Sequence, residues 1–280
     1  MDQFEIVIVA DRVDQSEIEV VLQGNHLNYR IVCSEGPGIV EALNTGLQNI
    51  TSEYVARMDE DDIMCPNRLE LQMDYLDRTS NCVAVGGQLD LIDEYGSSIG
   101  ESVFRRKIGN SYWQLFTASP VAHPAAMIRR RALTQIGGYR AFLAEDWDLW
   151  TRLREIGEVH NLSQKVIKYR IHRNQLSREK MYAQSHARLI VGVSYFARQS
   201  KIADEPSNAL ELDVWLAETI ERLRSVSLRF RLFRRWARRI NKYQERLNHL
   251  MMTKKISSGL VLLIQYPIWF LRDILKKAFN

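Results

Sequence analysis

The sequence predicts an α/β fold, with a doubly wound, Rossmann-like and mostly parallel sheet and helices on both faces. Apolar, β-branched runs alternate with helical patterns over about the first sixty residues, which is typical of consecutive β-α-β units. The third run then ends in consecutive acids, at the edge where sheets of this kind bind ligands. From residue 181 the alternation stops, and we expect a helical C-terminal extension.

The elements before the acids follow from their lengths and patterns. Residues 4–9 (FEIVIV) form a β-branched run of the length expected for a buried parallel strand. In residues 16–22, Ile18, Val21 and Leu22 share one face of a predicted helix. The remaining elements up to the acids are a strand at residues 29–33, a helix after the turn at residues 36–38, and a strand at residues 54–58.

Four consecutive acids at residues 59–62 follow the third strand directly. Neighbouring carboxylates repel one another unless a cation lies among them. Hard oxygen ligands at a strand's carboxyl end suit Mg²⁺ or Mn²⁺, and a metal placed there usually holds the phosphates of a nucleotide. Helix capping is the alternative: Asp62 and the acids before it would complement the positive end of a helix that begins near Pro66. Both hypotheses stay open on these residues alone.

After the acids the patterns predict a second series of elements. In chain order they are a helix at residues 66–76, a strand at 83–87 continuing through 89–92, a loop and edge strand at 97–110, a strand at 125–128, and a helix at 131–136 capped by Gly137 and Gly138. His123 precedes a proline, and we expect it to make a structural hydrogen bond.

A second acidic pair, Glu145 and Asp146, stands before two tryptophans at positions 147 and 150. This pattern suggests a helix N-terminus whose carboxylates face a cleft. The alternative is that the two acids only cap the helix. For the tryptophans we favour a place in the core.

Charge is distributed unevenly along the chain. The formal net charge is +4, but residues 222–255 hold twelve Lys or Arg and one acid, so the remainder is net −7. The apolar run at residues 259–271 is too short to span a bilayer, which takes about twenty residues. It fits an amphipathic anchor on an anionic membrane surface, or a helical cap with a solvated basic face. No nucleic acid is expected, because no recognition motif is present.

The three cysteines indicate the compartment. Cys33, Cys65 and Cys82 form neither a metal-binding spacing nor an even disulfide set, which fits a reducing cytoplasm. The first residues show no signal-peptide pattern, so we expect no secretion. With the basic tail, these features predict a cytoplasmic protein that is peripheral on the inner face of the membrane.

Three consecutive blocks resemble the core of family 2 (GT-A type) glycosyltransferases. They are G-I-V-E-A-L-N-T-G-L at residues 38–47, S-E-Y-V-A-R-M-D-E-D-D at 52–62 and P-N-R-L-E-L-Q at 66–72. The resemblance implies that Asp59 and Asp61 occupy the two positions of the D-x-D motif, with Asp59 on the ribose side of the donor and Asp61 on the metal. It also places Asp11, Gly38 and Asn44 at the nucleotide pocket.

Two later blocks extend the resemblance to residue 177. They are G-G-Y-R with E-D-W-D-L-W-T-R-L at residues 137–153, and Y-R-I-H-R-N-Q-L-S at 169–177. The first implies that Asp146 is the catalytic base of an inverting transfer. The second makes His172 a candidate third metal ligand, which Mn²⁺ accepts more readily than Mg²⁺, or a hydrogen-bond donor to the diphosphate. A structural or merely exposed histidine is the alternative for His172.

Family 2 enzymes usually begin with a further strand and helix, and this sequence shows no counterpart to that unit before residue 4. Without the usual first strand, we expect backbone N–H and C=O groups to be left unpaired on both sides of the gap. A truncated, non-catalytic remnant or binding module is therefore one alternative function. A nucleotidyltransferase that releases pyrophosphate is another.

The expected function is the inverting transfer of a sugar from a nucleotide diphosphate donor to an acceptor hydroxyl. Residues 1–180 would form the catalytic domain and residues 181–280 the basic helical extension. A glycan or lipid-linked acceptor, used in envelope or surface polysaccharide synthesis, would suit a membrane-surface tail.

Overall fold

The computed structural model describes residues 4–106, 119–140, 145–172, 191–192, 194–201 and 219. The chain divides into two compact units, residues 1–111 with 119–181, and residues 112–118 with 182–280. All the strands and helices named below lie in the first unit. The predictions for residues 222–255 and 259–271 lie outside the described residues, and the assignment of the domains stays a prediction.

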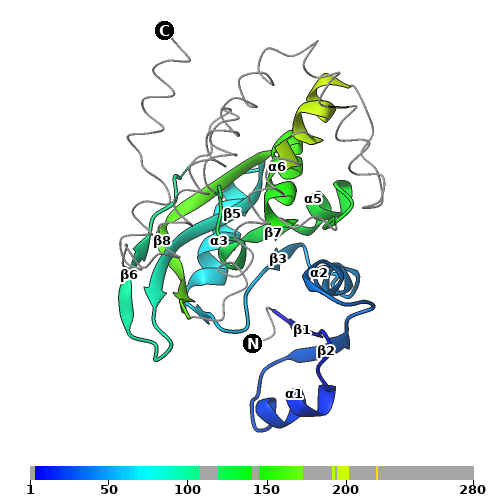
Figure 1. The fold of residues 1–280 in the computed structure, drawn as a ribbon. Coiled ribbons are helices and arrows are strands. Elements are labelled where there is room, and N and C mark those ends of the chain that lie inside the picture. The colour runs from blue at the N-terminus through cyan, green and yellow to red at the C-terminus, as the bar shows by residue number, and fades with distance from the viewer. Residues whose placement is uncertain are drawn as a thin grey trace, which may run out of the picture. The chain divides into compact units, whose positions relative to one another are not determined.

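A small two-stranded sheet forms from the start of the chain (the blue part of the ribbon in Figure 1). Its elements are β1 (Ile6–Ala10), α1 (Gln15–Leu22), β2 (Tyr29–Cys33) and α2 (Ile39–Gln48). β1 and β2 are parallel, with Ile6 beside Tyr29 and Ala10 beside Cys33. The four elements lie close to where the sequence predicts them.

Burial of this small sheet differs from the prediction. Only Ala10 of β1 is buried, whereas a fully buried strand was expected. In α1 no residue is buried, and Val21 of the predicted core face is 77% exposed. The physical reason is that, among the described strands, β1 pairs only with β2, and a strand is buried by neighbours on both of its edges.

A second sheet holds the other strands. They are β3 (Tyr54–Ala56), β4 (Ile63–Met64), β5 (Cys82–Ile92), β6 (Ser98–Ser102), β7 (Met127–Arg129) and β8 (Glu158–Arg170). The order is β3-β7-β5-β8-β4, with β6 paired to β5. The long strands β5 and β8 run parallel at its centre, side by side in Figure 1.

The α/β class is confirmed, but the larger sheet is mixed rather than mostly parallel. β3, β4, β6 and β7 each pair antiparallel with their neighbours. The β5–β6 pair shows the reason, since a short turn joins its strands and only an antiparallel return is possible over so few residues. Among the described strands, β1 and β3 each have one partner strand and one unpaired edge, as do β2, β4 and β6.

Helices of the first unit pack on the larger sheet. They are α3 (Arg68–Arg78), the 3₁₀ turn η1 (His123–Ala125), α5 (Arg130–Gln135) and α6 (Glu145–Ile156). The predicted glycine cap ends α5: Gly137 and Gly138 have φ of +76° and +71°, and the N–H of Gly138 donates to the carbonyl of Leu133 at 2.9 Å. Among the described residues, no helix is long and apolar enough to cross a bilayer.

A buried arginine at the start of α3 anchors the end of β3. Arg68 is only 1% exposed. Its guanidinium donates to the carbonyl of Arg57 at 2.7 Å and to Gln72 Oε1 at 3.0 Å. Gln72 in turn donates to the carbonyl of Ala125 at 2.8 Å. Burial lowers the pKa of Arg68 to about 10. The P-N-R-L-E-L-Q block therefore fixes the backbone directly before the four acids.

Replacing Arg68 by Met is expected to lower the free energy of unfolding by about 2–4 kcal/mol, because the carbonyl of Arg57 and the side-chain oxygen of Gln72 lose their buried donor. Arg78→Met is the matched control on the same helix. Arg78 makes an exposed pair with Asp74, so its loss should change the value by less than about 0.5 kcal/mol. Urea unfolding measures both, and equal effects would contradict the anchor.

Candidate functional site

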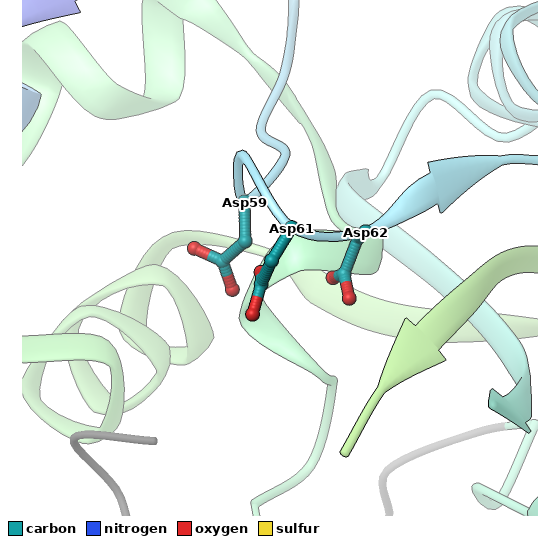
Figure 2. A group of neighbouring side chains, drawn as sticks. All are labelled: Asp59, Asp61 and Asp62. Carbon is teal, nitrogen blue, oxygen red and sulfur yellow. The ribbon is translucent and has the colours of Figure 1, made fainter. Parts of the chain in front are cut away.

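Three of the four consecutive acids turn toward one another. Figure 2 shows the side chains of Asp59, Asp61 and Asp62 on the same side of the loop between β3 and β4. One carboxylate oxygen of each lies within 4.8 Å of the others, whereas Glu60 is exposed and does not join them. Oxygens bound to one Mg²⁺ stand up to about 4.2 Å apart, so small side-chain movements suffice to hold such an ion. We call these three residues the acidic group.

An arginine and a histidine already contact members of the acidic group. Arg57 Nη2 lies 2.5 Å from Asp59 Oδ1, and His172 Nε2 lies 2.9 Å from Asp61 Oδ2. The predicted metal residues Asp61 and His172 are therefore brought together, although they are 111 residues apart in the chain. Together these residues offer carboxylate oxygens and one imidazole nitrogen, a donor set that fits Mn²⁺ or Mg²⁺.

Asp62 is the buried member, at 7% exposure. Its Oδ1 accepts the backbone N–H of Arg170 at 2.9 Å, and its buried Oδ2 has no hydrogen-bond partner among the described residues. Burial, followed by the charges of Asp59 and Asp61, raises the pKa of this carboxyl to about 6. Asp62 does not cap α3, whose N-cap residue is Asn67, so the capping hypothesis is wrong for this residue.

The end of β8 clamps the acidic loop. Arg170 donates from its backbone to Asp62, and its Nε donates to the carbonyl of Asp61 at 2.8 Å. Its Nη1 donates to the carbonyl of Asp93 at 3.0 Å, at the end of β5. This clamp sets His172, two residues further on, beside Asp61.

Asp11 and Gly38, both predicted at the nucleotide pocket, lie together at the small sheet. Asp11 directly follows β1, and its Oδ2 accepts the N–H of Gly38 at 2.9 Å. Gly38 opens α2 with φ of +98°, a conformation that favours glycine. The structure therefore pairs one carboxylate with the N-terminus of α2.

Asn44 makes a structural clip. Its Nδ2 donates to the carbonyl of Tyr139 and its Oδ1 accepts the N–H of the same residue, both at 2.9 Å. These bonds hold α2 against the turn that follows α5. The nucleotide-binding role of Asn44 stays a prediction.

Asp146 lies in the first turn of α6, where its Oδ1 accepts the N–H of Trp147 at 2.8 Å. Its charge acts on the buried phenol of Tyr139, whose pKa is raised first by burial and further by Glu145 and Asp146. The charge of Arg57, the partner of Asp59, acts on the same phenol and opposes this rise. The phenol of Tyr139 is therefore subject both to the charge of the predicted base and to that of Arg57, the partner of Asp59.

His123 contacts the hydroxyl of Tyr139, and Trp150 packs against His123. His123 makes the expected structural hydrogen bond, with its Nε2 2.9 Å from the hydroxyl of Tyr139. Trp147 and Trp150 are buried, which confirms their place in the core. Trp150 meets the ring of His123 edge-on, with 6.0 Å between the ring centroids.

Sequence reasoning missed several residues that shape the site. Arg57, Arg68 and Arg170 were not selected, although each is a basic residue inside or beside a motif block. Asp148 was also missed: it is fully buried and accepts from Arg152 Nε at 2.8 Å, while Arg152 donates to the carbonyl of Gly138. The one signal was the four-residue spacing of Asp148 and Arg152, which puts both on one helix face.

Comparisons with known proteins agree with the resemblance. The family model described as glycosyl transferase family 2 matches residues 1–137. The amylovoran biosynthesis glycosyltransferase AmsE of Erwinia amylovora is 33% identical over 59% of this chain, but the match spans only 64% of AmsE. The O-antigen biosynthesis glycosyltransferase WbnJ of Escherichia coli is 34% identical, and the match covers 60% of this chain and 68% of WbnJ.

A solved structure shows the same fold. The mannosyltransferase PcManGT from Pyrobaculum calidifontis, in complex with GDP-Man and Mn²⁺, has a TM-score of 0.50 and 18% identity, and the match covers 90% of this chain and 75% of that one. At this identity the likeness concerns the fold alone. It confirms the GT-A prediction.

The buried imidazole of His123 gives a pH-dependent prediction. Burial, and then the charge of Arg57, hold its pKa well below the usual value of about 6.5. Below pH 6.5 the histidine of the unfolded chain takes up a proton, whereas the buried imidazole of the native protein does not. The free energy of unfolding therefore keeps its full value above pH 6.5 and falls as the pH drops, by up to about 1.4 kcal/mol per pH unit. In His123→Gln, the free energy of unfolding measured in urea should depend less steeply on pH between pH 5 and 7.5. An identical pH dependence in the variant and the unaltered protein would contradict the prediction.

Proposed function

This chain belongs to glycosyltransferase family 2, and from its site we propose that it transfers a sugar from a nucleotide diphosphate donor to an acceptor hydroxyl with inversion. One observation carries the proposal. Arg57 pairs with Asp59 of the acidic group, and the charges of Arg57 and Asp146 both act on the buried phenol of Tyr139. The acidic group, His172 and Asp146 belong to the same unit of the chain, which supports a cation site and a base that act together.

We propose Mn²⁺ or Mg²⁺ as the cofactor, held by Asp61 and His172. The carboxylate and imidazole donors support this, and so does the Mn²⁺ named with PcManGT. When bound, the ion neutralises the departing diphosphate as a Lewis acid and orients it.

On the donor side, Asp59 contacts the ribose, and its carboxylate is already oriented by Arg57. Asp11 and Gly38 line the nucleotide pocket, supported by their hydrogen bond at the start of α2. Asn44 contributes to the same pocket from the next turns of that helix.

On the acceptor side, Asp146 takes the proton of the attacking hydroxyl. A general base must lie within hydrogen-bond reach of the proton that it removes. Trp150 of α6 is buried against the ring of His123, which also hydrogen-bonds to the buried Tyr139, and these contacts support a fixed position for the helix that bears this carboxylate.

For the acceptor we propose a glycan or lipid-linked saccharide used in envelope or surface polysaccharide synthesis. The names of AmsE and WbnJ, which refer to amylovoran and O-antigen biosynthesis, support this class. Residues 1–180 would carry catalysis, while the basic residues 222–255 would hold residues 181–280 on an anionic membrane surface at its cytoplasmic face.

The unpaired edges of β1 and β3 favour one second candidate. In the part of the chain that the structure describes, neither strand has a neighbour on its other edge, so the nucleotide side of the site has less support than a continuous sheet gives. A module that binds a nucleotide sugar without turning it over would have the same motifs. Turnover separates the two candidates.

Asp146→Asn is expected to lower kcat by a factor of about 10² to 10⁴, because the acceptor hydroxyl loses its base while donor binding stays intact. The assay measures the nucleoside diphosphate released from UDP- and GDP-sugars with Mn²⁺ and lipid-linked acceptors. Glu155→Gln is the matched control, an exposed acid near the other end of α6. Full turnover by the Asn variant would contradict the role of Asp146. Donor binding without turnover in the unaltered protein would favour the binding module.

A further inference from the structure

One oxygen of the acidic group is buried and unused. Asp62 is more than nine-tenths buried, yet its Oδ2 has no hydrogen-bond partner among the described residues. A buried carboxylate oxygen without a partner is costly, on the order of 1–3 kcal/mol or more. Such an atom in a folded protein calls for an explanation, and an ion is one.

The direction of the side chain fits that explanation. In Figure 2 the carboxylate of Asp62 points to the same side as those of Asp59 and Asp61. One oxygen of each of the three lies within 4.8 Å of the others. The unused oxygen therefore belongs to a carboxylate that turns into the acidic group.

Charge distinguishes Asp62 from its two neighbours. Asp59 is paired with Arg57 and Asp61 with His172, whereas no ion pair is formed by Asp62 among the described residues. Asp59 and Asp61 are half-buried, and a basic side chain of the protein contacts each of them, whereas in the described part of the chain none contacts the buried carboxylate of Asp62. A cation from solution would supply the missing partner.

We propose that Asp62 is a third protein ligand of the divalent cation, beside Asp61 and His172. The proposal rests on the cation site of the proposed function and adds a ligand to it. Asp62 is positioned in advance, because the N–H of Arg170 holds its Oδ1 at 2.9 Å and leaves Oδ2 for the ion. A ligand fixed in this way loses little side-chain freedom on binding.

Binding of Mn²⁺ to the metal-free full chain tests the proposal without any turnover. Electron paramagnetic resonance of unbound Mn²⁺ gives the dissociation constant in the absence of nucleotide and acceptor. Asp62→Asn keeps an acceptor for Arg170 but removes the charge, and is expected to weaken Mn²⁺ binding by about tenfold or more. Glu60→Gln is the matched control, since Glu60 is an exposed acid in the same loop outside the acidic group, and should stay within about twofold.

Equal Mn²⁺ affinity of Asp62→Asn and the unaltered protein would overturn the proposal, as would a failure of the unaltered protein to bind Mn²⁺. Should the Asn variant not fold, Asp62→Glu replaces it. It keeps the charge but displaces the carboxylate by one methylene, so weaker binding supports the ligand and unchanged affinity overturns it. Sugar transfer with normal Mn²⁺ binding by the Asn variant would leave the function standing and remove the ligand. Weakened Mn²⁺ binding by Asp62→Asn, together with no sugar transfer by the unaltered protein, would support the ligand and contradict the proposed function.

Discussion

The buried guanidinium of Arg68 is the contact on which the site depends. It donates to the carbonyl of Arg57, while the N–H of Arg57 donates to the carbonyl of Ala126, directly before β7. Both backbone groups of residue 57 are therefore fixed, two residues before the first aspartate. A loop of four like charges tends to spread, and this anchor, with the clamp of Arg170 at its other end, holds three of the carboxylates together.

The electrostatics of the site follow from that restraint. Asp59, Asp61 and Asp62 act together on Tyr169, whose pKa burial and these three charges raise to about 12. The charge of Arg57 opposes this rise in pKa at Tyr169 and acts in the same direction on the buried phenol of Tyr139. A bound cation, as proposed above, would offset more of the negative charge.

Sequence reasoning located the elements but not their environment. The helix at residues 66–76 and the glycine cap after α5 follow from local spacing, and the structure places both within a few residues. The half-buried state of β1 depends on what lies along its other edge, which no local pattern contains. Likewise four adjacent acids look alike in sequence. Asp62 becomes the buried one because the end of β8 offers it a backbone N–H.

The clip between Asn44 and Tyr139 joins a helix of the small sheet to the turn before α6. Gly138 allows it: a Cβ there would lie 2.7 Å from Asn44 Oδ1, and its φ of +71° already disfavours any side chain. A larger residue at position 138 would push the amide out of its two bonds and release α2. Positions 44 and 138 therefore constrain each other's evolution, and we expect them to change as a pair.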